Sequence, residues 1–111
     1  MAWKNLESIA ELDAIIEASF SQPQLIFKHS TRCGISSGAK FRLDDDLENL
    51  GNQYSLHLLD LLQHRDISAQ IANQFSVTHQ SPQILLIENG KAVVHLNHYR
   101  IAPSSILAAH R

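Results

Sequence analysis

The chain has 111 residues, of which 44% are hydrophobic and 18% charged, and its formal net charge is -2 with the seven histidines neutral. This composition is that of a single globular domain over residues 1–111, with too little charge for disorder. It has no run of Lys or Arg, no stretch long and apolar enough for a membrane span, and no signal peptide pattern. We therefore expect a cytoplasmic protein with neither a nucleic acid nor a membrane as partner.

The first half of the chain alternates helical and extended patterns. A capping-box pattern precedes apolar residues at helical spacing and predicts a helix over residues 9–19. The apolar run at 25–27 predicts a short buried strand that opens at once into a polar loop. A second helix is predicted to begin at Ile35, to bend or break at the three aspartates 44–46, and to end at Gly51.

The second half adds two more helices and three strands. Alternating apolar and polar residues predict a strand over 54–60, and Asp66 is a suitable N-cap for the next helix. Two apolar runs separated by Asn89-Gly90 predict a tight hairpin over 83–96, because both central residues must accept positive φ. Pro103 suits the first turn of a closing helix.

This order of elements predicts an α/β fold. Connections through helices make the early strands parallel, whereas the hairpin makes the last two antiparallel, so we expect a mixed four-stranded sheet flanked by helices. The order is similar to that of a thioredoxin-like domain with an extra N-terminal helix.

The one cysteine of the chain, Cys33, is the candidate reactive group. It is predicted to lie between a strand and a helix, where unpaired amides and the helix dipole favour a thiolate. Arg32 adds a positive charge, and the Ser36 hydroxyl is placed to donate a hydrogen bond to the sulfur. With no second cysteine, any disulfide must form with another molecule. The alternative is a small buried core cysteine.

A second feature is the pair Ser81-Pro82, directly before an apolar strand. Proline cannot donate to a sheet ladder, so it belongs at the start of that strand. A cis peptide bond there would place the Ser81 backbone beside Cys33, where it could pair with an extended substrate. The alternative is an ordinary trans proline that begins a strand.

Several blocks of the sequence resemble the YtxJ-type monothiol bacilliredoxins, in the order of that family and up to His98. These blocks are Phe27–Ser36, Leu59–Leu61, Arg65–Ser68, His79–Gln83 and Glu88–Lys91. The resemblance implies a thioredoxin-like fold, and an oxidoreductase whose Cys33 removes the small thiol bacillithiol from cysteines of client proteins. It also implies bacillithiol as co-substrate and no tightly bound cofactor. The usual family motif is Cys-Pro-Ile-Ser, whereas this chain has Gly34 in second place. Glycine loosens the helix start and with it the stabilisation of the thiolate, which puts the rate and the partner range in question more than the reaction type.

The same resemblance suggests where bacillithiol would bind. The malate carboxylates of bacillithiol need positive partners, for which Lys28, Arg32 and Arg100 are candidates together with the helix N-terminus. Thr31, next to the cysteine, is counted with the binding residues. His79 precedes Ser81-Pro82, so it could approach Cys33 and contact the bound thiol, although a solvated role is equally compatible with the sequence.

Two other interpretations remain open. The string Cys33-Gly34-Ile35-Ser36 is similar to the Cys-Gly-Phe-Ser motif of monothiol glutaredoxins, which carry a two-iron two-sulfur cluster, but the Gly-Gly-Asp typical of those proteins is absent after the hairpin. A thioredoxin-like binding module without turnover is the other. The histidines form no recognised metal pattern with Cys33, so we expect no metal site and histidines on the surface.

Overall fold

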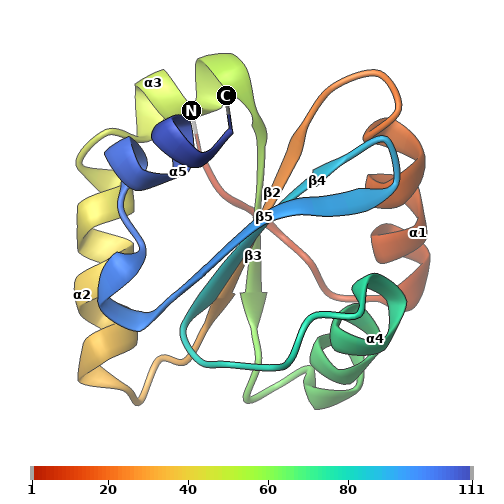
Figure 1. Ribbon diagram of the computed structural model, residues 1–111. Coiled ribbons are helices and arrows are strands. Elements are labelled where there is room, and N and C mark those ends of the chain that lie inside the picture. Colours follow the sequence, from red (N-terminus) through yellow and green to blue (C-terminus); the bar gives the residue numbers. More distant parts are fainter. Residues whose placement is uncertain (1, 111) are drawn as a thin grey trace.

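The computed structural model describes residues 2–110, which build one five-stranded sheet with helices on both faces (Figure 1). The order of the strands across the sheet is β1-β3-β2-β4-β5. Their bounds are Lys4–Asn5 for β1, Gln24–His29 for β2, Ser55–Asp60 for β3, Gln83–Glu88 for β4 and Lys91–Asn97 for β5.

The pairing of the strands is mixed, as the sequence predicted. Strand β3 runs parallel to both β1 and β2, whereas β4 runs antiparallel to β2 and β5. The prediction of four strands was incomplete because β1, an edge strand of two residues, was missed. A segment this short shows no periodicity, and its strand character comes from its pairing with His57 and Leu58 of β3.

The helices form two layers, which Figure 1 shows on either side of the sheet. On one side lie α1 (Ile9–Ala18) and α4 (Arg65–Phe75). On the other lie α2 (Gly34–Asp44), α3 (Leu47–Gln53) and α5 (Pro103–Ala109), with the short 3-10 helix η1 (His98–Arg100) before α5. None of the helices within residues 2–110 has both the length and the apolar character needed to cross a bilayer.

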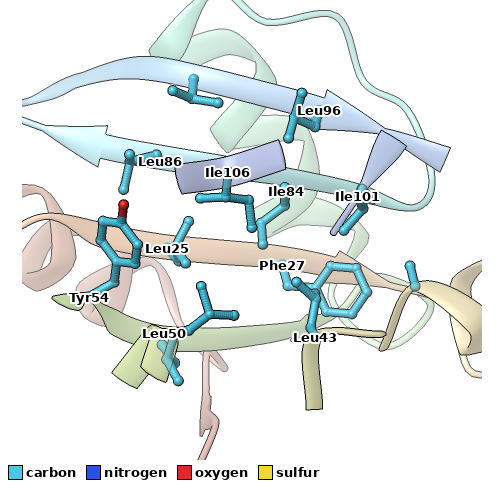
Figure 2. Close-up of a cluster of buried hydrophobic side chains, with 13 residues drawn as sticks. Leu25, Phe27, Leu43, Leu50, Tyr54, Ile84, Leu86, Leu96, Ile101 and Ile106 are labelled. Carbon is cyan, nitrogen blue, oxygen red and sulfur yellow. The ribbon is translucent and has the colours of Figure 1, made fainter. Parts of the chain in front are cut away.

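Each face of the sheet carries its own apolar core. Leu25 and Phe27 of β2 point toward α2 and α5, and they lie beside Leu86 and Ile84 of β4, respectively (Figure 2). Ile26, between them in sequence, points to the other face and packs with residues of α1 and α4. Because both faces are covered, every residue of β2 is buried, which is why this strand shows no polar alternation.

The structure settles one open helix boundary and shifts two others. Of the bend or break expected at the aspartates, the structure has the break, and the helix that follows, α3, continues past the predicted end at Gly51 to Gln53. Helix α4 begins at Arg65 with His64 as its N-cap, so Asp66 lies in the first turn instead of capping it. An acidic side chain in the first turn still interacts favourably with the positive end of the helix dipole.

Candidate functional site

Cys33 is the N-cap residue of α2 and is half-buried. Its backbone is extended, with φ -112° and ψ 121°, and its carbonyl accepts the first helical hydrogen bond from the Ser37 N–H at 3.0 Å. The Cys33 N–H donates to the Ser30 carbonyl at 3.2 Å, which closes a turn before the helix. Cys33 is therefore a partly exposed residue at a helix N-terminus, not one sealed in the core.

The start of α2 gives this sulfur a favourable electrostatic setting. The first amides of a helix have no carbonyl within the helix to bond, and they carry the positive end of its dipole. Arg32 is exposed directly before the cysteine, and Gly34, the first residue of α2, is exposed directly after it.

Ser36 holds the cysteine loop in place through contacts with residues before it. Its buried Oγ accepts a hydrogen bond from the Ser30 N–H at 3.0 Å and lies 2.6 Å from Nδ1 of His29. These contacts direct the hydroxyl toward His29 and Ser30, and within residues 2–110 no hydrogen bond reaches the Cys33 sulfur. Burial, together with the charge of Lys40, lowers the pKa of His29 and so favours the neutral form of the ring.

The Ser81-Pro82 peptide bond is cis, in the loop that leads into β4. Gln83, the next residue, pairs with Lys28 of β2, so this loop and the loop that carries Cys33 emerge at the same end of two bonded strands. The Pro82 carbonyl accepts from the His98 N–H at 3.0 Å. Within residues 2–110 the backbone of Ser81 makes no hydrogen bond, which leaves it available to an extended chain.

The position of Lys28 differs more from its prediction than that of the other candidate residues. It lies in β2, not in a polar loop, and its side chain is fully buried on the α4 side of the sheet. Its ammonium donates to the Ser68 carbonyl, and its Nζ lies 3.3 Å from Nδ1 of His79. As an anchor for a solvent-borne carboxylate it is therefore badly placed. Burial lowers the pKa of Lys28 to about 8.

The sequence did not reveal that Lys28, Ser68 and His79 meet. The Ser68 Oγ lies 3.2 Å from the same Nδ1 of His79, whose ring is otherwise exposed. Burial of that nitrogen, and then the charge of Lys28, lower the pKa of His79. These residues are far apart in sequence, and no local pattern signals the contact.

The remaining predicted residues are exposed, but not all histidines are. Thr31 and Arg100 lie at the surface. His29 and His57 are buried, which corrects the expectation of surface histidines; Nε2 of His57 lies 2.8 Å from Oε1 of Gln24. In the described part of the chain, no three His, Cys, Asp or Glu side chains are grouped as metal ligands.

A lone cysteine at a helix N-cap, at the same end of this mixed sheet as a cis-proline loop, defines a thioredoxin-like protein with a single thiol. Solved structures agree on the fold. One described as a candidate oxidoreductase with a thioredoxin fold is 31% identical over 96% of this chain and 92% of its own, with a TM-score of 0.86. Thioredoxins of Malassezia sympodialis and Fasciola hepatica are 16% and 19% identical, with TM-scores of 0.75 and 0.70. The first covers 97% of this chain and 87% of its own, the second 86% of each.

The sequence match is more specific than the fold. The model of the family described as monothiol bacilliredoxin BrxC matches residues 4–106, which include the cysteine loop, the cis-proline loop and all five strands. The chain belongs to this family, in agreement with the resemblance stated from its motifs.

Proposed function

We propose that the protein removes bacillithiol from mixed disulfides on cysteines of client proteins, with Cys33 as the nucleophile. The accessible position of Cys33 at the N-terminus of α2 is the observation that carries this proposal. Family membership supports bacillithiol as the small thiol. The unengaged Ser81 backbone supports a client bound as an extended segment.

The reaction is one thiol-disulfide exchange. The Cys33 thiolate attacks the bacillithiol sulfur of the client disulfide, and a new bond joins Cys33 to bacillithiol as the old sulfur-sulfur bond breaks. The electron pair of the broken bond leaves with the client sulfur, so no external oxidant or reductant is consumed. Ser36 occupies the position one turn into the helix and cannot form a disulfide, so free bacillithiol or a separate reductase must release the capped enzyme.

Binding of the small thiol is assigned to the exposed residues around the cysteine. Arg32 and the N-terminus of α2 are the proposed partners of the bacillithiol carboxylates, because both lie on the solvent side of the loop. Thr31, also exposed, is the proposed neighbour of the bound thiol. Lys28 is not included, since its ammonium is buried on the far side of β2.

The test is release of bacillithiol from a modified client protein, followed by mass spectrometry. Wild-type protein should release it and acquire one bacillithiol on Cys33, whereas Cys33→Ser should do neither. Ser37→Ala removes an exposed hydroxyl of α2 that lies four residues after Cys33. It is the matched control and should retain activity. Equal release by wild type and Cys33→Ser would refute the proposal.

The choice of small thiol is tested in the same assay. A client carrying glutathione in place of bacillithiol should be processed more slowly if the site recognises the malate carboxylates. A Cys33 that reacts with both no faster than a free thiol would instead indicate a binding module without turnover.

A further inference from the structure

We propose that Lys28 and His79, both in contact with Ser68, form a proton-donating chain that protonates the client sulfur released during exchange at Cys33. This inference rests on the proposed thiol exchange and assigns the destination of its electron pair. It uses a buried cation that the exchange at Cys33 leaves without a role.

The first observation is a buried ammonium with no counter-charge. Within residues 2–110, Lys28 is the one buried side chain among the lysines, arginines, aspartates and glutamates. Its two hydrogen-bond partners, the Ser68 carbonyl and Nδ1 of His79, are both neutral, and no carboxylate in that part of the chain forms a salt bridge with it. A buried, unpaired charge destabilises the folded state, and groups of this kind concentrate at functional sites.

The second observation fixes the orientation of His79. Its Nδ1 lies 3.3 Å from the Lys28 ammonium and 3.2 Å from the Ser68 hydroxyl. An ammonium can only donate, so Nδ1 must be the unprotonated acceptor of the ring. The neutral ring then carries its proton on Nε2, on the side away from Lys28, where the residue is exposed.

The third observation is that the loop bearing His79 is held firmly at the end of the sheet where Cys33 lies. The Gln83 side chain donates to the Thr78 carbonyl at 3.0 Å, and the His98 N–H donates to the Pro82 carbonyl at 3.0 Å. His79 lies between these anchors and two residues before Ser81. Figure 1 shows this loop, between α4 and β4, at the same end of the sheet as the turn from β2 into α2.

The proposed step balances as follows in protons and electrons. As the bond between the client and bacillithiol sulfurs breaks, the client sulfur takes the proton of His79 Nε2, while His79 Nδ1 takes a proton from the Lys28 ammonium. Lys28 is left as a neutral amine and is protonated again from water by the reverse path. With a pKa of about 8, Lys28 is matched to an ordinary cysteine thiol at about 8.5, so the transfer is close to balanced.

The test compares two disulfides whose leaving thiols differ in acidity, an aromatic nitrobenzoate disulfide and the disulfide of 2-mercaptoethanol. The acidic aromatic thiolate needs no proton, whereas the alkyl thiolate does. In Lys28→Met and His79→Gln we therefore expect the rate constant for the alkyl disulfide to fall at least about tenfold and that for the aromatic disulfide to change less than about twofold. Lys91→Met, an exposed lysine of β5, should leave both rates unchanged.

Equal slowing with both disulfides, or no slowing with either, would overturn the inference. His79→Gln alters an exposed ring, so it provides the answer even if Lys28→Met does not fold. Because neither probe contains bacillithiol, the two proposals fail separately. If the variants show the unequal slowing but the wild type releases no bacillithiol, the proposed function falls and the proton chain stands. If the wild type releases bacillithiol but the variants show no unequal slowing, only the proton chain falls.

Discussion

Gly34 is the first helical residue of α2, and a Cβ built on it would have no neighbour within 4 Å. Cys33 already has the extended backbone that a residue before proline requires. Proline, usual at this place in the family motif, is favoured at a first helical position. We therefore expect Gly34→Pro to raise the free energy of unfolding by about 0.4–1 kcal/mol, measured by urea denaturation, because the unfolded chain loses freedom.

A matched variant separates the rigidity of proline from the mere loss of glycine. Gly34→Ala also restricts the unfolded chain but leaves φ free and keeps the N–H, so its gain in stability should be smaller. A Gly34→Pro protein less stable than the wild type would contradict the expectation.

At the level of single residues, the sequence predicted positions better than partners. Cys33 could be placed from local pattern alone, because the apolar run before it and the helical spacing after it both lie within a few residues. The buried contacts of Lys28 could not, since Ser68 and His79 are 40 and 51 residues away. From the sequence, a lysine after an apolar run indicates the start of a loop. Only the packing of α4 over the aliphatic part of its side chain shows that Lys28 is buried.

Among the elements, the β4–β5 hairpin depends on one turn. Asn89 and Gly90 have φ of 54° and 76°, and a Cβ on Gly90 would lie 2.9 Å from Cζ of Phe20. Gly90→Ala should therefore lower the free energy of unfolding by roughly 1–2 kcal/mol, from left-handed strain and displacement of the Phe20 ring. Thermal and urea unfolding measure it.

The control for this variant is Asn89→Gly, which relieves positive φ at the neighbouring turn position and adds no contact. It should leave the stability within about 0.5 kcal/mol of wild type. A Gly90→Ala protein as stable as that control would show that the turn is not under this constraint.

Helices and strands were predictable to the extent that their signals are local. The hairpin was predicted because Asn89-Gly90 itself sets the turn. Strand β1 and the last two residues of β2, Lys28 and His29, were missed because their strand character comes from pairing with β3 across the sheet. The end of α2 was only partly predicted, since three adjacent aspartates signal a break without saying whether a helix resumes at Leu47.

For the whole molecule, the order of elements was enough to predict the mixed sheet, because a helical crossover and a two-residue turn each allow one strand direction. What it could not supply is the polar content of the two layers. On the α1 side, far from Cys33, His57 of β3 and Gln24 of β2 form a buried pair, although His57 was expected at the surface.

This pair makes the stability of the molecule dependent on pH. Burial, and then the charge of Lys4, lower the pKa of His57 from 6.5 to about 4. Above pH 6.5 the ring is neutral in both the folded and the unfolded state, so its burial adds no pH-dependent penalty to folding. Below pH 6.5 the unfolded chain binds a proton that the folded protein excludes. The contribution of His57 to the free energy of unfolding is therefore fully present above pH 6.5. It is lost progressively as the pH falls toward about 4, and this loss is at most about 3 kcal/mol.

His57→Gln, which keeps a donor for Gln24, should remove this part of the pH dependence. Urea unfolding at about pH 7 and about pH 5 would show it as a smaller difference between the two conditions in the variant than in the wild type. His95→Gln, an exposed histidine of β5, is the control and should follow the wild type. If His57→Gln loses as much stability on acidification as His95→Gln, then His57 is not the group that resists protonation, and the slope must come from the other two histidines with lowered pKa, His29 and His79.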